Sequence, residues 1–562
     1  MTAYAEIGFP ASAAKPSLRG TIVEGGLTWP LAGIAFVLAL QFTMIFTRAL
    51  NWDEFYHYSL VELFARGTVT QPLQTFFVRL FYWLPRLPGG EIDHVIAARL
   101  VMFCCELVAA AAAGALAARF TDRAAGVLAS LCYLSAGFVL QYGFSFRADP
   151  VAAALLMSML WLLGCTSFRG WRIVAFSVMG AVAALYTIKC VLYAPAFVGV
   201  AHLRWSEAEE KGALVRRLIA ACAIAVVVFA MLLFAHSRAV PHAAQSAGAL
   251  LGASAERMPR LGGSPLYRQF ILEAALTAPV IALLILAFPL TLRSAVFSRP
   301  EKWALFGLWS EILVLGIYQN TAQYFYVFIL PPVAVACAVP LSRLPARLSP
   351  KIVVTALAGF AFIMWAADDR TTIDKQRALL RAADSIFPTP VSYFDFCGML
   401  GRDDKANGFM TPWGAQLYRE GAVPSMRETM RQKAVPLLVE NDPMFTRLLR
   451  ERGPSQDFLP EDASALRETY LHFWGPFWVA GKIVPADAKQ VAAHILVPGP
   501  YTVSLGDVQV DGRFVPAGHI VDLERGTHRF SGMSGHAVRL TWGRNLRAPA
   551  EQPPAPPYWI PF

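Results

Sequence analysis

The sequence predicts a mainly α-helical membrane protein with about eleven transmembrane helices and a soluble C-terminal domain that has an α/β part and a β-sandwich-like part. Of the 562 residues, 56% are hydrophobic and only 16% are charged, a balance typical of chains whose solvent is partly lipid. Before residue 367, apolar stretches long enough to cross a hydrocarbon core of roughly 30 Å recur. After it, charged residues and turn signals become frequent, so we expect the chain to divide there.

The expected transmembrane domain covers residues 29–366. Its fifth and sixth spans share one hydrophobic run, while the others are separated by polar loops. The predicted spans are 29–48, 97–118, 125–141, 150–166, 173–187, 188–203, 217–235, 272–292, 303–318, 325–341 and 351–366.

Lys and Arg clusters predict the orientation of the chain. Under the eleven-span count these clusters all fall in loops on one side, and cytoplasmic loops are the ones that retain such residues. Residues 1–28 are then a cytoplasmic N-terminus, without a cleavable signal pattern, and the first span serves as the insertion signal. The opposite side receives loop 49–96 and the soluble domain 367–562.

The basic excess of the chain follows from this topology. The formal net charge is +10, yet residues 367–562 contain 22 Lys plus Arg and 22 Asp plus Glu. A nucleic-acid-binding protein needs a basic stripe on a soluble face. The balanced soluble domain has none, so no nucleic-acid partner is expected.

The soluble domain is expected to be composite. Residues 367–455 alternate helical and strand patterns and predict a small α/β layer, whereas residues 490–545 alternate apolar and polar residues between turn dipeptides such as Asp511-Gly512. The Pro-rich tail is either a linker-like end or a strap across another surface. Three tryptophans are candidates for stacking on sugars, although a buried core is the more usual place for them: Trp413, Trp474 and Trp478.

The segment Asn51-Trp-Asp-Glu-Phe-Tyr-His-Tyr58, just beyond the first span, has two interpretations. In the structural one, Asn51 caps a helix together with Glu54, and both acids favour the helix N-terminus. In the functional one, a carboxylate above the bilayer acts as general base on an acceptor hydroxyl, within reach of a lipid-borne phosphate ester. The rest of loop 49–96 has aromatic residues at helical intervals with Arg between them, which predicts interfacial amphipathic helices that could admit a lipid from the side.

The arrangement resembles the C-type glycosyltransferase (GT-C) superfamily, particularly its protein O-mannosyltransferase and lipid A aminoarabinose-transferase branches. The resemblance covers most of residues 29–366. It departs where many relatives carry a Lys-Pro-Pro segment, because this chain reads Thr70-Gln-Pro-Leu-Gln74. The matching features are the Asp53-Glu54 pair, the interfacial loop ending in Ala97-Ala-Arg99-Leu, the Arg-x-Asp of Phe146-Arg-Ala-Asp-Pro150, the Gly to Lys segment 180–189, and the aromatic stretch from Gln323 to Pro332.

The resemblance implies that Asp53 is the catalytic base, that Glu54 orients the acceptor or a metal, and that the donor is a sugar on a polyprenyl phosphate. Negative charge grows on the departing phosphate during transfer and needs fixed cations. Arg147 and Lys189 are the candidates. Lys189 lies within a long apolar run, where an unneeded cation costs at least about 2.5 kcal/mol.

Several candidates have structural alternatives. Arg147 is a candidate for snorkelling to the head-group region, Asp149 is expected to be a helix N-cap rather than a ligand, and Arg99 is either a phosphate contact or an interface anchor. His57 and Tyr324 are additional candidates for the site, although a lone His beside aromatic residues is more often structural. Two intramembrane acids, Glu106 and Glu311, have either a function or a structural pairing between helices.

The sequence has no HExxH or Asp-x-Asp spacing, so a divalent metal is compatible with it but unsupported, and no cofactor is assigned. The expected acceptor is a lipid, glycan or protein. There are two competing interpretations: a transporter or flippase of lipid-linked sugars, and a polysaccharide polymerase or ligase. The internal repeats typical of transporters are not evident in the sequence. Residue usage and the family branch indicate a bacterial cytoplasmic membrane with the soluble domain in the periplasm.

Overall fold

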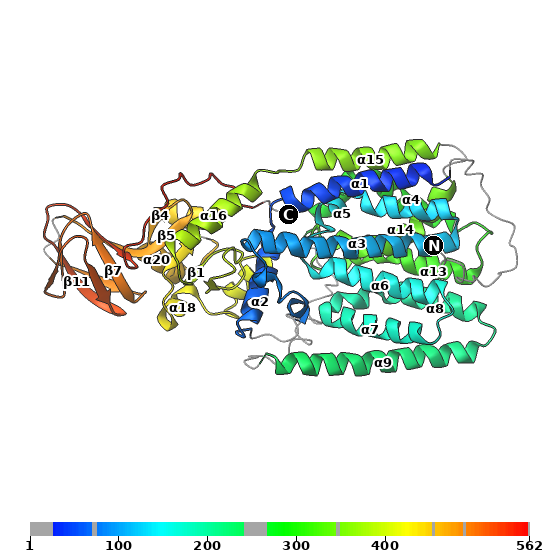
Figure 1. The fold of residues 1–562 in the computed structure, drawn as a ribbon, viewed down its shortest axis with the longest axis horizontal. Coiled ribbons are helices and arrows are strands. Elements are labelled where there is room, and N and C mark those ends of the chain that lie inside the picture. Colours follow the sequence, from blue (N-terminus) through cyan, green and yellow to red (C-terminus); the bar gives the residue numbers. More distant parts are fainter. Residues whose placement is uncertain are drawn as a thin grey trace.

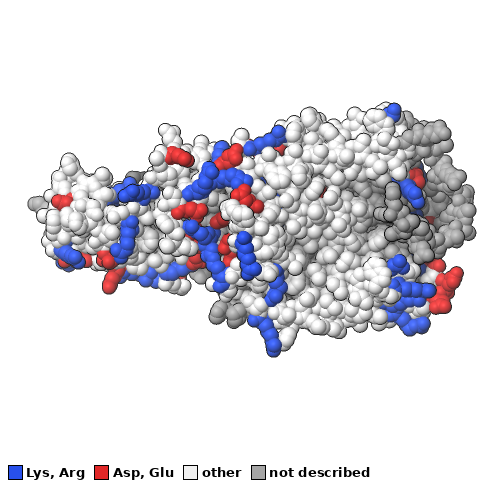
Figure 2. Space-filling view, in the orientation of Figure 1, with Lys and Arg blue, Asp and Glu red and all other residues white. Residues whose placement is uncertain are grey.

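The computed structural model describes residues 26–69, 76–240, 267–343, 349–451, 456–486 and 490–559. Apolar helices lie side by side in a bundle, and a sheet-containing domain is joined to one end of it (Figure 1). Charged side chains gather on the sheet-containing domain and at the far end of the bundle, whereas the surface between is almost free of them (Figure 2). This is the charge distribution expected of a chain whose middle part lies in lipid.

Every predicted span is occupied by helix, but the helices differ in length. The bundle is made of α1 (Thr28–Thr47), α3 (Glu91–Phe120), α4 (Arg123–Leu134), α5 (Gly137–Tyr142), α6 (Ala148–Cys165), α7 (Trp171–Tyr186), η3 (Ile188–Tyr193), α8 (Ala194–Glu207), α9 (Lys211–Arg238), α11 (Gln269–Thr277), α12 (Pro279–Thr291), α13 (Arg299–Trp309), η4 (Ser310–Gly316), α14 (Phe325–Arg343) and α15 (Pro350–Ala366).

The expected count of eleven spans is not confirmed. Among the described residues, five helices are long and apolar enough to cross a membrane, or six if α11 and α12, which meet at a bend of 103°, form one span. The five are α1, α3, α6, α9 and α14. Three further apolar helices, α4, α7 and α15, are shorter.

Helix breaks explain the difference. A helix rises about 1.5 Å per residue, so the 11 residues of α13 reach only about 16 Å, little more than half of a hydrocarbon core. The predicted span 125–141 is divided between α4 and α5, and the predicted span 188–203 begins with a 3-10 turn, η3. Hydropathy measures how apolar a segment is, but it does not reveal where the helix is interrupted.

The loop between α1 and α3 contains the helix that carries Asp53. Helix α2 (Trp52–Ala65) begins with a capping box, in which the Asn51 side chain accepts the Glu54 amide and the Glu54 side chain accepts the Asn51 amide. The second expected amphipathic helix is instead two short 3-10 turns, η1 (Phe76–Leu80) and η2 (Leu84–Arg86). The Thr70-Gln-Pro-Leu-Gln74 stretch lies outside the described residues.

In the soluble domain, short parallel strands are flanked by helices. Strand β1 (Ser392–Phe394) pairs in parallel with β2 (Asp404–Lys405) and with β3 (Leu437–Val439). Antiparallel β5 (Phe477–Val484) extends this sheet toward the second half of the domain, and β4 (Tyr470–Trp474) pairs with β5. The helices are α16 (Thr372–Ile386), α17 (Pro412–Arg419), α18 (Met426–Gln432), α19 (Pro443–Arg450) and α20 (Pro460–Thr469).

The last part of the domain is a two-layer β structure with its own apolar core. One layer continues from β5 through β12 (Val538–Trp542) and β7 (Gly499–Ser504) to β10 (Ile520–Leu523). The other has the order β6 (Val491–Ile495), β11 (Gly526–Gly532), β8 (Val508–Val510), β9 (Arg513–Val515). As the turn dipeptide predicts, Asp511 and Gly512 connect β8 to β9 with φ angles of +50° and +85°.

The soluble domain is hydrogen-bonded to the start of the α2 region. The side-chain amide of Gln376, on α16, accepts from Leu50 N (2.9 Å) and donates to Leu50 O and Tyr558 O (2.8 Å each). The C-terminal tail therefore returns to the end of the bundle (Figure 1), and there Trp559 stacks on Phe396 of the soluble domain at 5.4 Å. Of the two interpretations of the Pro-rich tail, the strap describes this arrangement.

Candidate functional site

Helix α2 presents different side chains to three neighbours, because successive residues on a helix point about 100° apart. Trp52 and Tyr56 face the soluble domain, with ring centroids 5.2 Å from Phe396 and 4.8 Å from Phe409. Asp53 faces the start of α6. Glu54 faces α3, so the two adjacent acids of the motif have different surroundings.

Asp53 belongs to a cluster of alternating charges at the end of the bundle. Its carboxylate forms an ion pair with Arg147 Nη1. Arg147 Nε also lies 3.3 Å from the Asp149 carboxylate, whose other oxygen forms an ion pair with Lys189 Nζ. The side chain of Asp149 is 2% exposed, whereas that of Asp53 is 16% exposed. Asp149 therefore anchors both cations, and Asp53 remains at the accessible edge.

Aromatic rings from α14 and the loop before it form one wall of this cluster. The Arg147 guanidinium carbon lies 3.2 Å from the centroid of the Tyr324 ring, and Lys189 Nζ lies 5.7 Å from that of Tyr324 and of Phe325. Such cation–π contacts hold a cation in place without neutralising it. The predicted residues Asp53, Arg147, Lys189 and Tyr324 thus come together in one place, although they are far apart in the sequence.

Glu54 and Arg99 form a second, fully buried ion pair beside the cluster. The Glu54 carboxylate accepts from Arg99 Nε (2.7 Å) and Nη2 (2.5 Å), and also from the Phe146 amide (2.9 Å) and from Asn51. The remaining donors of Arg99 bond to the carbonyl oxygens of Ile45, Arg48 and Ala49 at the end of α1. This pair joins α1, α2, α3 and the residue that precedes Arg147.

These contacts change the interpretation of both residues. Arg99 makes five hydrogen bonds to the protein, which equals the number of its N–H groups, and its side chain is 1% exposed. A phosphate would have to displace some of these bonds. The arrangement therefore favours a structural position for Arg99 over the expected phosphate contact, and the same holds for Glu54 as a ligand of acceptor or metal.

His57 lies one helical turn after Asp53, against aromatic rings. Its ring centroid is 4.7 Å from that of Phe77 and 6.3 Å from that of Phe146. Burial lowers the pKa of His57 to about 4, although the negative charge of Asp149 opposes this. Nδ1 is buried and has no hydrogen-bond partner among the described residues. His57 is thus a neutral ring next to the cluster.

Asp149 belongs to the cluster, although the sequence favoured a helix N-cap over a ligand at this position. The prediction that Asp149 caps a helix is wrong, because the N-cap of α6 is Arg147 and Asp149 lies within its first turn. The Arg-x-Asp spacing was the available signal, since it places both charges at one helix start. Within the described part of the chain, no group of three or more His, Cys, Asp or Glu is placed to hold a metal ion.

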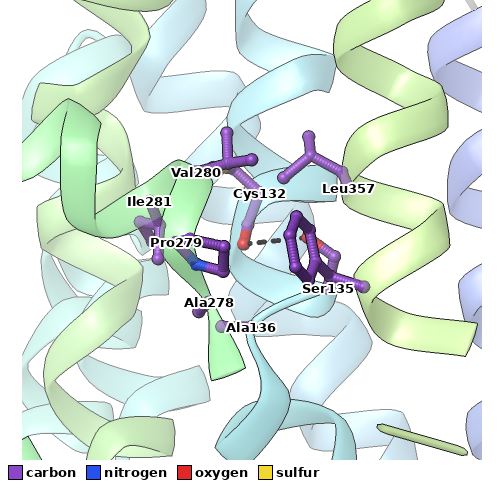
Figure 3. Close-up of a pocket in the computed structure, with 9 residues that line it drawn as sticks. Cys132, Ser135, Ala136, Ala278, Pro279, Val280, Ile281 and Leu357 are labelled. Carbon is purple, nitrogen blue, oxygen red and sulfur yellow. Dashed lines mark hydrogen bonds between the residues drawn. The ribbon is translucent and has the colours of Figure 1, made fainter. Parts of the chain in front are cut away.

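Other candidate places are less suited to the chemistry. A small apolar cavity between α4, α12 and α15 has no charged lining residue, and within it the Ser135 hydroxyl donates to the Cys132 carbonyl at 3.3 Å (Figure 3). Of the tryptophans, Trp474 is buried and donates to Glu551 O at 3.1 Å, and Trp478 donates to Glu440 at 2.7 Å. The side chain of Trp413 lies outside the described residues.

The fold class is defined by a bundle of apolar helices, an acid-bearing helix directly after the first span and a soluble domain packed on that helix. The protein has the fold of the GT-C glycosyltransferases, as the resemblance predicted.

Comparison with solved structures gives the particular relatives. The chain is similar to ArnT from Cupriavidus metallidurans bound to undecaprenyl phosphate, with a TM-score of 0.54 and 15% identity over 75% of this chain and 94% of that one. The apo state of ArnT matches with a TM-score of 0.52 and 16% identity, over the same shares. An oligosaccharyltransferase from Archaeoglobus fulgidus in complex with Zn and sulfate matches with a TM-score of 0.45 and 11% identity, over 89% of this chain and 75% of that one. No protein-family model and no curated protein matches the sequence.

Proposed function

We propose that the protein is a membrane glycosyltransferase that moves a sugar from a polyprenyl-phosphate donor to an acceptor hydroxyl. The observation that carries the proposal is the accessible Asp53 carboxylate beside two cations, Arg147 and Lys189, at the end of an apolar bundle. A base and a phosphate-binding pair at that position are what transfer from a lipid phosphate requires. The ArnT structure of the same fold is described as bound to undecaprenyl phosphate, which supports this class of donor.

In the proposed step, the acceptor oxygen forms a bond to the anomeric carbon of the sugar. The bond between that carbon and the phosphate oxygen breaks, and the polyprenyl phosphate leaves with the electron pair. Asp53 takes the proton of the acceptor hydroxyl. Arg147, with its planar fork of donors, and Lys189, as a compact charge, stabilise the growing negative charge on the phosphate.

The buried pair Glu54–Arg99 is proposed to position the two halves of the site. Glu54 adjoins Asp53 in the chain and accepts the amide of Phe146, which adjoins Arg147. One carboxylate thereby sets the distance between the base and the cation. Asp149 is proposed to set the distance between Arg147 and Lys189, since it forms ion pairs with both.

The proposal extends to location and acceptor. The site lies at the end of the bundle that carries the soluble domain, and the charge distribution of the loops leads us to assign this end to the non-cytoplasmic face. Residue usage and the family branch lead us to propose that the membrane is a bacterial cytoplasmic membrane. Tyr56 of α2 contacts Phe409 of the soluble domain next to the site, so the acceptor, a lipid, glycan or protein, is proposed to enter beside this contact.

The experiment combines binding of undecaprenyl phosphate with transfer of a radiolabelled sugar from polyprenyl phosphate to a membrane extract. Asp53→Asn is expected to lower transfer at least about a hundredfold, since a general base contributes that much or more. It should leave undecaprenyl phosphate binding intact, because Arg147 loses a competing anion. Arg147→Ala and Lys189→Ala should weaken that binding at least about tenfold, the value of one charge-assisted hydrogen bond.

Asp374→Asn is the matched control, because Asp374 is an exposed acid on α16. It should bind and transfer as the wild type does. Unchanged transfer in Asp53→Asn would refute the role of Asp53. Unchanged binding in both cation variants would refute the lipid-phosphate donor.

A further inference from the structure

Glu106 is a fully buried acid in the middle of α3 that the proposed reaction does not use. One carboxyl oxygen accepts from Gln41 Nε2 at 3.0 Å, and Oε2 has no hydrogen-bond partner among the described residues. A charged side chain within a transmembrane helix costs at least about 2.5 kcal/mol at the centre of the bilayer, so an ionisable residue there usually has a function. The contacts of Glu106 indicate what it does.

The carboxyl group of Glu106 packs against Gly143, directly after α5. A Cβ at Gly143 would overlap the Glu106 carboxyl atoms Oε1, Cδ and Oε2. The Gln41 amide that donates to Glu106 also lies 3.1 and 3.3 Å from the carbonyl oxygens of Val139 and Leu140 in α5. Glu106 and Gln41 together fix where α5 ends.

The chain from Gly143 to Arg147 is short and has little freedom. Phe144, Ser145 and Phe146 are all buried, with exposed fractions of 0 to 1%. The far end is held by the hydrogen bond from the Phe146 amide to Glu54. Since a buried and packed segment transmits displacement instead of absorbing it, a shift at Gly143 reaches Arg147.

We propose that Glu106 is a positioning residue for Arg147, acting from within the bundle through its close contact with Gly143. The Glu106 carboxyl fills the space that a side chain at position 143 would occupy, and so sets how closely the Gly143–Phe146 segment approaches α3. Glu54 holds the other end of the same segment. The backbone segment that leads to Arg147 is thus held by two carboxyl groups, Glu106 at Gly143 and Glu54 at Phe146. This inference rests on the proposed role of Arg147 in binding the donor phosphate.

The test is the affinity of the full-length protein for undecaprenyl phosphate in detergent micelles. Gly143→Ala should weaken binding about tenfold, because a displaced Arg147 loses one charge-assisted hydrogen bond to the phosphate. Glu106→Gln keeps the length and the hydrogen bond from Gln41, so it should bind within about twofold of the wild type. Gly359→Ala is the control, because a Cβ at this α15 glycine meets nothing within 4 Å.

The double variant Glu106→Ala/Gly143→Ala gives the decisive comparison. Once the carboxyl group is gone, the added methyl has room, so the double variant should bind as tightly as Glu106→Ala alone, which itself should be weakened about threefold. Such non-additivity is expected of residues in contact, whereas distant and independent sites give additive effects. The thermal midpoint, measured in parallel, separates misplacement of Arg147 from general unfolding.

The outcomes that overturn the proposal are distinct from failure of the proposed function. Wild-type affinity in Gly143→Ala, or a double variant as weak as Gly143→Ala, overturns the positioning role while Arg147→Ala still weakens binding. If Gly143→Ala does not fold, Glu106→Ala decides, and wild-type affinity there overturns the proposal. If Arg147→Ala binds normally, the proposed function itself is refuted.

Discussion

Replacing Glu54 with Gln tests whether the buried pair with Arg99 organises the site. The carboxylate accepts two hydrogen bonds at Oε1, from Arg99 Nε and the Phe146 amide, and three at Oε2, from Arg99 Nη2 and the two nitrogens of Asn51. A Gln side chain has only one acceptor oxygen. The orientation that loses fewer hydrogen bonds keeps this oxygen at the Oε2 position, and the NH2 group then faces the two donors at the Oε1 position, so two hydrogen bonds are lost. Each lost bond to a charged group is worth about 1.5 to 3 kcal/mol, which sums to roughly 3 to 6 kcal/mol.

An independent estimate agrees, because removing one partner of a buried ion pair costs about 3 to 5 kcal/mol. We therefore expect Glu54→Gln to lower the free energy of unfolding by about 3 to 5 kcal/mol. The measurement is unfolding in mixed micelles, followed by tryptophan fluorescence. Glu207→Gln is the control, because Glu207 also pairs with arginines, Arg119 and Arg204, but is 41% exposed. It should cost at most about 1 kcal/mol. A loss in Glu54→Gln no larger than that of the control would refute the reasoning.

Two further predictions concern stability. Arg48→Ala leaves the Asp368 carboxylate, 2% exposed, without its cation and should cost about 3 to 5 kcal/mol, measured by the same unfolding, with Arg48→Lys recovering part of it. A cost below about 1 kcal/mol would show that the pair is not buried in solution. Because the pKa of His57 is lowered to about 4, the folded state resists its protonation. Stability should then fall as the pH drops from about 6.5 toward 4, by roughly 1 to 2 kcal/mol at pH 5, and this loss should be absent in His57→Gln. Parallel pH profiles of the two proteins would contradict the prediction.

Local patterns predicted much of the architecture. The apolar segments and the capping box at Asn51 depend on residues close in sequence, so they could be read directly. The same holds for the hairpin at Asp511-Gly512, because the left-handed backbone it requires is a property of those residues. Span number was predicted less well, since the breaks within α4–α5 and α11–α12 leave an apolar run apolar, and the second break falls at Ala278-Pro279, where proline disfavours a continuous helix.

The candidate site could be predicted only in part. The sequence by itself determined that Asp53 and Arg147 lie at span ends, because the hydropathy boundaries place them there, whereas Lys189 lies within an apolar run that was divided into two predicted spans. It could not decide that Asp53 faces these cations while Glu54 faces Arg99, nor that Asp149 joins both cations. The contact between Glu106 and Gly143 could not be predicted from the sequence either. Adjacent residues on a helix point about 100° apart, so which partner each one meets is settled by how the helices pack, and only the tertiary structure contains that packing.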